Sequence, residues 1–244
     1  MHLRTYQAAL DALDSLPQNA ATFVVTKELT PLGEALQFLR RMGYRPDDLN
    51  KLNVIHVAGT KGKGSTCAYC YSLLRKTAPQ LKIGLFTSPH LVSVRERIQI
   101  DGKLISSEDF ARFFFEVWDK LETTKDQGHP DAPMPSPHRM LTLVAYHAFL
   151  CLDVNATILE ALVGGRVDGT NVVPKPIVTG ITALGIDHTS LLGNTLPEIA
   201  WHKAGIYKAG VPAYTVNQPP EALEVVKQEA EKVQVGSPLG LLKD

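Results

Sequence analysis

A short glycine-rich segment contains the residue types that hold a nucleotide phosphate, namely Gly59, Thr60, Gly62, Lys63, Gly64, Ser65 and Thr66. Glycine has no Cβ, so the backbone N–H groups of such a turn can close around an anion. Lys63 supplies an ammonium group for the outer phosphates, and the hydroxyl of Ser65 or Thr66 suits a Mg²⁺ ion carried by the nucleotide. An apolar run at residues 54–58 precedes the segment and a helical pattern follows it, which is the context expected of a phosphate loop.

The segment departs from the general phosphate-loop pattern G-x-x-x-x-G-K-[ST] at two positions. Gly62 and Lys63 fit the end of the pattern, but Val57 stands in place of its first glycine and Gly64 in place of its Ser or Thr. A glycine-rich turn that binds nothing is the alternative interpretation. The apolar run before the turn, the lysine within it and the helical pattern after it favour phosphate binding.

Single polar residues follow other apolar runs, and each has two interpretations. Glu160 ends such a run, where it is either a ligand of a Mg²⁺ ion bound to nucleotide or an edge residue that reaches water. His188 either joins the same ion or is a hydrogen-bonded structural histidine. Ser88, which precedes Pro89, is by itself an ordinary turn serine.

Basic residues elsewhere suggest contacts with an acidic ligand. Arg95 and Arg97 flank Glu96 in a strand-like segment, and period-two alternation would place both arginines on one face. They suit a ligand that carries a carboxylate, and a solvated charged face is the alternative. Lys203 falls on a short predicted helix, where we expect the side chain to be exposed.

The composition limits the class of protein. The 244 residues suffice for one large domain or two small ones, and 25 basic and 25 acidic residues cancel, so no overall field draws the chain to nucleic acid or an anionic membrane. Three cysteines are too few for a disulfide framework and indicate a reducing compartment. Cys67 and Cys70 form a C-x-x-C pair, for which packing on a helix is favoured over a redox or metal role. We find neither a secretory signal, a transit peptide nor an apolar stretch long enough to span a bilayer.

Apolar periodicity divides the chain into alternating helices and strands. It predicts strands at 54–58, 82–87, 156–160, 177–184 and 213–216, and helices at 6–16, 31–42, 106–121, 140–150, 197–207 and 221–233, with an exposed loop at 123–137. This alternation predicts an α/β fold with a doubly wound, mostly parallel sheet. The polar residues above all follow strands, and ligands of such folds bind at the carboxyl ends of the strands.

Five motifs, taken together and in order, closely resemble those of the folylpolyglutamate synthases of the Mur ligase superfamily. They are VAGTKGKGST, TSPHLVSVRERI, GGRVDGTN, LGIDHTSLLGNT and IAWHKAGIYKAGVP, and the likeness extends from residue 6 to about residue 239. The shortened loop with its extra Gly64 is a feature of that family. The resemblance implies a fold of the Mur ligase central-domain type, with a phosphate loop.

The resemblance also implies a reaction, which is the ATP-dependent addition of L-glutamate to the γ-carboxyl of a reduced folylpolyglutamate through an acyl phosphate. It implies ATP and Mg²⁺ as cofactors, with a monovalent cation such as K⁺ as a further candidate, and a monomer that binds neither nucleic acid nor membrane. It assigns the loop residues named above, with Asn171, to ATP, and Lys63, His188 and a carbamylated Lys203 to catalysis. The metal ligands would be Ser88, Glu160 and His188, and the folate loop would contain Pro89, His90, Leu91, Arg95 and Arg97.

Two departures from the family bear on these expectations. Leu162 stands where the family usually has glycine in an E-x-G-x-G-G turn, and a bulky residue there would shift Glu160. The family also has a C-terminal domain, so we expect residues 1–244 to be a single ATP-binding domain that ends before it. A nucleotide- or folate-binding fragment without catalysis and a dihydrofolate synthase remain alternatives to the ligase. The expected location is the cytoplasm, with a mitochondrial form as an alternative.

Overall fold

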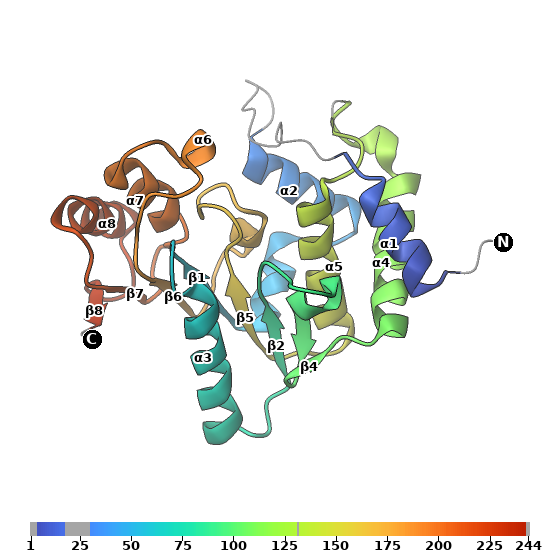
Figure 1. Cartoon of the computed structure of the whole chain (residues 1–244), viewed down its shortest axis with the longest axis horizontal. Coiled ribbons are helices and arrows are strands. Elements are labelled where there is room, and N and C mark those ends of the chain that lie inside the picture. Colours follow the sequence, from blue (N-terminus) through green and yellow to red (C-terminus); the bar gives the residue numbers. More distant parts are fainter. Residues whose placement is uncertain (1–3, 18–29, 131, 243–244) are drawn as a thin grey trace.

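A single mixed sheet of eight strands organises the chain (Figure 1). The computed structural model describes residues 4–17, 30–130 and 132–242. The strands, in the order β4-β3-β2-β5-β1-β6-β7-β8 across the sheet, are β1 (Val54–Ala58), β2 (Ile83–Phe86), β3 (Ile98–Ile100), β4 (Lys103–Leu104), β5 (Ala156–Glu160), β6 (Val178–Ile181), β7 (Ala213–Val216) and β8 (Gly240–Leu242). The helices are α1 (Tyr6–Asp14), α2 (Pro31–Arg41), α3 (Lys63–Thr77), α4 (Ser107–Thr123), α5 (Pro137–Cys151), α6 (Thr189–Leu192), α7 (Leu196–Ala204) and α8 (Pro220–Val233).

The predicted parallel, doubly wound sheet is confirmed. β1 lies at its centre, paired in parallel with β5 on one side and β6 on the other. β2 and β7 extend the parallel pairing outward. The structure adds three strands that were not predicted. β3 and β4 form an antiparallel edge beside β2, and β8 pairs in parallel with β7.

Alternating residues of the central strands pack into separate hydrophobic clusters on the two faces of the sheet. Ile55 and Val57 pack with Cys67 of α3, whereas Val54 packs in the cluster formed with α2, α4 and α5. This alternation follows from the period of two in an extended chain. Helix α5 lies so close to β2 that a Cβ added at Gly84 would approach the ring of Phe149 to 3.0 Å.

Local sequence signals set most helix boundaries. The side chain of Ser106 accepts a hydrogen bond from the N–H of Asp109 and caps α4, and Thr195 and Glu198 form a capping box at the start of α7. Proline occupies the first turn of α2 and of α5, where its missing N–H would have no helical partner. The predicted helices are therefore confirmed, with ends that differ by a few residues.

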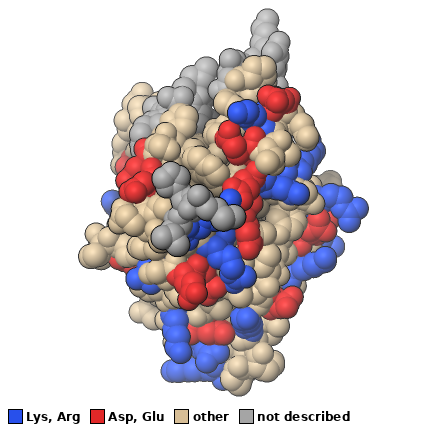
Figure 2. All heavy atoms as spheres, turned by 90° about the vertical axis from the view of Figure 1, so that its right-hand side faces the viewer, with Lys and Arg blue, Asp and Glu red and all other residues tan. Residues whose placement is uncertain are grey.

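The surface around α1 and α4 carries mixed charge. Figure 2 shows basic and acidic side chains interspersed on this side of the molecule. Arg4 and Asp119 form one of the ion pairs there, with a separation of 2.6 Å. In the parts of the chain that the structure describes, no helix has the length and apolarity to cross a membrane.

Candidate functional site

The glycine-rich loop joins the end of β1 to the start of α3, as predicted. The N–H groups of Thr60 and Lys61 both donate to the carbonyl of Ala183, at 3.0 Å, and so fasten the loop to the segment after β6. Gly62 caps α3 with φ of +83°, a left-handed conformation that favours glycine. The first-turn N–H groups of α3 have no acceptor within the helix and are free to bind an anion.

Gly59 is required for a different reason. A Cβ at this position would overlap the side-chain oxygen of Thr182, on the segment that follows β6. The hydroxyl of Thr182 donates to the carbonyl of Ala58 at 3.3 Å. The loop therefore lies directly against its neighbouring strand end, and only glycine fits there.

Glu160, at the end of β5, faces the loop. Its carboxylate is 3% exposed, lies 3.9 Å from the Nζ of Lys63, and accepts a hydrogen bond from the N–H of Ser88 at 3.3 Å. Burial raises the pKa of Glu160, and the Ser88 N–H, Lys63 and Arg97 oppose that rise. The residue is thus a buried carboxylate with long contacts, and a cation would supply the missing compensation. The bulk of Leu162 does not turn this carboxylate away from the loop.

His188 approaches the same region from the other side. It precedes α6 with φ of +50°, and the side chain is 44% exposed, with its Nε2 4.0 Å from a carboxylate oxygen of Asp187. The N–H of His188 donates to Asp187 at 2.8 Å and contributes most to a lowered pKa of that carboxyl. His188 and Ser88 both line one cavity with Lys63, so the structure brings these predicted residues together.

Lys203 is buried, which contradicts the expectation of an exposed side chain. It is 2% exposed, and its Nζ donates to the carbonyl of Gly59 at 2.8 Å. Burial, together with the smaller effect of the nearby charge of Lys63, lowers its pKa to about 8. The helical period alone could not show this, because α7 packs against α8 and Lys203 reaches the loop at Gly59, so its side chain is shielded from water.

The paired arrangement predicted for Arg95 and Arg97 is wrong. These residues lie in a 3₁₀ helix, Val94–Arg97, rather than a strand, so they do not share a face. Arg95 donates to the carbonyl of Ile105 at 3.1 Å and stacks over the ring of Tyr6. Arg97 is buried and donates to Nδ1 of His90 at 2.9 Å.

The carboxylate of Glu96 shapes the loop before this 3₁₀ helix. It accepts hydrogen bonds from the N–H groups of Leu91, Val92 and Ser93 at 2.7 to 3.0 Å. These bonds lower the pKa of Glu96. Leu91 itself remains 90% exposed at the tip of the loop.

A cavity of about 420 Å³ opens beside the phosphate loop. Of the predicted site residues it is lined by Lys63, Ser88, Pro89, Arg97 and His188. Asn171 is not among its lining residues, because its amide donates to the carbonyls of Arg166 and Gly205 at 3.0 Å. The prediction that Asn171 binds ATP finds no support in this placement.

Several lining residues were missed by the sequence reasoning, namely His138, Arg139, Thr142, Asp168 and Asp187. His138 and Arg139 lie in the first turn of α5, and their position directly after Ser136 and Pro137, residues typical of a helix start, could have drawn attention to them. Asp168 lies within the motif GGRVDGTN and holds the turn after β5, accepting from the N–H groups of Leu162 and Val163.

Asp168 also anchors a buried chain of hydrogen bonds. The hydroxyl of Thr170 donates to Asp168 at 2.6 Å and contacts Nε2 of His56 at 2.8 Å. Since the hydroxyl hydrogen is directed to Asp168, Nε2 of His56 must be the donor in the second bond. This bond fixes the orientation of the His56 ring in the middle of β1, and burial keeps the ring neutral by lowering its pKa to about 3.

The mostly parallel sheet, with a glycine-rich loop at the end of β1, defines a fold of the Mur ligase type. No family model matches the chain. It is 47% identical over 251 residues to the folylpolyglutamate synthase of Candida albicans, covering 96% of this chain and 49% of that protein. Over nearly its whole length, the chain is thus related to the folylpolyglutamate synthases.

Solved structures agree with this relationship. The apo form of L. casei FPGS matches with a TM-score of 0.83 and 31% identity, covering 97% of this chain and 54% of that one. An FPGS-AMPPCP-folate complex matches with the same TM-score, identity and coverage. The chain spans about half the length of the relatives it matches.

Proposed function

We propose that this chain is the ATP-binding unit, residues 1–244, of a folylpolyglutamate synthase that adds L-glutamate to the γ-carboxyl of a reduced folylpolyglutamate. The observation that carries the proposal is the convergence of Lys63, Ser88, Glu160 and His188 beside one phosphate loop. The 47% identity to a folylpolyglutamate synthase supports the substrate class, and so does the structural match to a complex with folate and AMPPCP, an ATP analogue.

The chemistry requires a carboxylate to be activated. A carboxylate is a poor electrophile until one oxygen becomes part of a leaving group. Transfer of the γ-phosphoryl group of ATP to the folate γ-carboxylate gives an acyl phosphate and ADP. Attack by the amine of glutamate then forms the amide and releases phosphate and a proton. Lys63 and the first-turn N–H groups of α3 would hold the phosphates and offset charge during the transfer.

Ser88, Glu160 and His188 would hold the Mg²⁺ ion that accompanies the nucleotide. The fit rests on the buried carboxylate of Glu160, whose contacts to Lys63 and Ser88 are long and leave room for a cation as a stronger partner. When bound, the ion would neutralise negative charge on the phosphates. The hydroxyl of Ser88, whose backbone N–H contacts Glu160, supplies a second oxygen donor.

Arg97 is the residue placed to receive an acidic acceptor. Its Nη1 is buried and has no hydrogen-bond partner among the described residues, whereas Nε is fixed by His90. A buried guanidinium with an unused N–H group favours an anionic ligand such as a carboxylate. We assign Arg97, rather than Arg95, to the folate side of the cavity.

The lowered pKa of Lys203 favours carbamylation. With a pKa of about 8, more of its amine is neutral near pH 7.5 than in an ordinary lysine, and the neutral amine is the form that reacts with CO₂. The carbamate would turn a cation beside Gly59 into an anion suited to a second cation, such as K⁺. Trapping the carbamate with an alkylating reagent and detecting it by mass spectrometry tests this assignment.

The proposal is tested with two measurements on the purified chain. Calorimetric titration with Mg·ATP is expected to give binding that Lys63→Ala weakens. Mass spectrometry after incubation with ATP, glutamate and tetrahydrofolate then asks for glutamylated folate, and dihydropteroate in a parallel reaction tests for dihydrofolate synthase. Nucleotide binding without either product would favour a binding unit, and no nucleotide binding at all would refute the proposal. A cytoplasmic location completes the proposal, and cell fractionation tests it against a mitochondrial form.

A further inference from the structure

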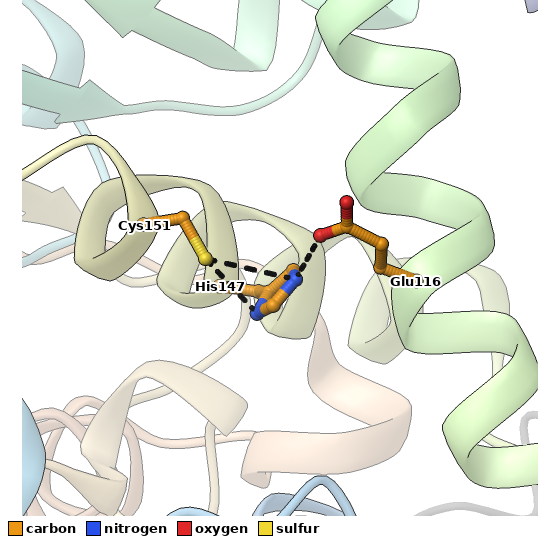
Figure 3. A group of neighbouring side chains, drawn as sticks. All are labelled: Glu116, His147 and Cys151. Carbon is orange, nitrogen blue, oxygen red and sulfur yellow. Dashed lines mark hydrogen bonds and ion pairs between the residues drawn. The ribbon is translucent and has the colours of Figure 1, made fainter.

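A cluster of metal-ligating side chains lies between α4 and α5, separate from the phosphate loop (Figure 3). It consists of Glu116 on α4 and of His147 and Cys151 on α5. One ligand atom from each residue lies within 4.8 Å of the other two. His147 and Cys151 are four residues apart, so a single helical turn places both on the same side of α5.

This cluster is remote from the cavity already described. His138 lines that cavity, and His147 follows it by nine residues on the same helix. At a rise of 1.5 Å per residue, the two histidines are separated by roughly 14 Å along the axis of α5. The cluster therefore cannot share a small ligand with the phosphate loop.

His147 is held in a defined orientation. Its Nε2 lies 2.6 Å from a carboxylate oxygen of Glu116, and its Nδ1 lies 2.7 Å from the hydroxyl of Tyr44. Protein zinc sites commonly have this second contact, in which the ring nitrogen that does not bind the metal is fixed by a hydrogen bond. An ion bound to Nε2 would replace the proton now shared with Glu116, and Nδ1–H would then donate to Tyr44.

The distances suit a small tetrahedral ion after limited side-chain movement. Zinc bond lengths of about 2.0 to 2.3 Å at tetrahedral angles place two ligand atoms roughly 3.3 to 3.6 Å apart. The Sγ of Cys151 lies 3.8 Å from Nε2 and 3.7 Å from Nδ1 of His147. Because the sulfur is about equally far from both nitrogens, it does not yet lie beside Nε2, the nitrogen that would bind the ion. Rotation about the Cα–Cβ bond of Cys151 would move the sulfur toward Nε2. The side chain is free to rotate because Cys151 is exposed and is the last residue of α5.

We propose that Glu116, His147 and Cys151 bind one Zn²⁺ ion and that the ion fastens α4 to α5. A thiolate and an imidazole favour zinc over the hard cations Mg²⁺ and Ca²⁺, and the carboxylate completes a ligand set found in zinc proteins. Binding forms bonds from sulfur, nitrogen and oxygen to the ion, and the thiol proton passes to the solvent. Water or an added anion takes the fourth position.

The competing explanation is a purely structural bridge in which His147 links Tyr44 to Glu116 without an ion. In that bridge the thiol of Cys151 makes only weak hydrogen bonds to His147 and Tyr44, which a serine hydroxyl can replace, whereas in the zinc site its thiolate binds the ion. Replacing the thiol therefore separates the two explanations. Because Cys151 is exposed, Cys151→Ser is not expected to disturb the fold, which circular dichroism would check.

The experiment uses Co²⁺ as a spectroscopic probe and Zn²⁺ competition against a chromophoric chelator, with the thiols kept reduced. We expect one equivalent of Co²⁺ to produce a near-ultraviolet absorption of sulfur-to-cobalt charge transfer, which Zn²⁺ removes. Cys151→Ser should abolish that absorption, and the matched control Cys70→Ser, on α3, should retain it. Glu116→Gln should weaken zinc binding, and Tyr44→Phe should weaken it by roughly 10- to 100-fold.

Two results would overturn the proposal. One is the absence of charge-transfer absorption and of stoichiometric zinc binding in the folded wild-type chain. The other is zinc binding that Cys151→Ser and Glu116→Gln leave unchanged, which would place the ion elsewhere. Loss of zinc binding in Glu160→Gln, with the three cluster residues intact, would locate that ion at the phosphate loop and count equally against the cluster.

Discussion

Acidification is expected to destabilise the fold through His56. This residue is 1% exposed in β1, and burial, with a smaller contribution from the charge of Lys208, lowers its pKa from 6.5 to about 3. Between these two values the unfolded chain binds a proton that the folded chain does not, so stability falls as the pH decreases from about 6.5 toward 3. At pH 5 the free energy of unfolding is about 2 kcal/mol lower than at pH 7.5. This follows because pH 5 lies about 1.5 units below the unfolded pKa, and each such unit lowers the stability by about 1.36 kcal/mol.

The assay compares wild type with His56→Gln by urea unfolding at pH 7.5 and pH 5.0. Glutamine keeps an N–H donor for the hydroxyl of Thr170 but does not titrate in this range. Other groups titrate in both proteins, so their contributions cancel in the difference. We expect the free energy of unfolding of the wild type to fall by about 2 kcal/mol more than that of the variant.

Two outcomes would refute this reasoning about His56. Equal losses of stability in the two proteins would mean that His56 accepts a proton in the folded state as easily as in the unfolded state. An NMR titration that places the pKa of the folded His56 ring near 6.5 would lead to the same conclusion directly.

Three further predictions concern the phosphate loop. Lys63→Ala is expected to weaken Mg·ATP binding roughly 10- to 100-fold in calorimetry, since a charge-assisted hydrogen bond is worth about 1.5 to 3 kcal/mol, and unchanged affinity would remove Lys63 from the site. Glu160→Gln should shift nucleotide binding to higher magnesium concentrations while leaving the thermal midpoint near that of wild type, and the same magnesium dependence in both proteins would make Glu160 structural. Gly59→Ala should destabilise the fold by roughly 1 to 3 kcal/mol through overlap with Thr182. The double variant with Thr182→Ala should recover part of that loss, and strict additivity of the two changes would contradict the overlap.

The sequence by itself determined the features that depend on neighbouring residues. Short apolar runs predicted the five parallel strands, and the capping serine Ser106 predicted a start of α4 close to the one observed. The strand, glycine turn and helix around Lys63 also followed from local order, because a phosphate loop is built from one continuous segment. The short strands β3, β4 and β8 escaped because three residues or fewer carry too little periodicity.

Only the tertiary structure decided which side chains are buried and which meet. Lys203 lies against Gly59 although 144 positions separate them, and Arg97 turned inward because its segment formed a 3₁₀ helix instead of a strand. The order of the strands likewise placed β1 between β5 and β6, which brought Glu160 beside Lys63. Tyr44, in the connection that follows α2, and His147 on α5 meet across 103 positions. Such contacts depend on long-range packing, which no local pattern encodes, because burial and electrostatic environment exist only once distant segments exclude water from one another.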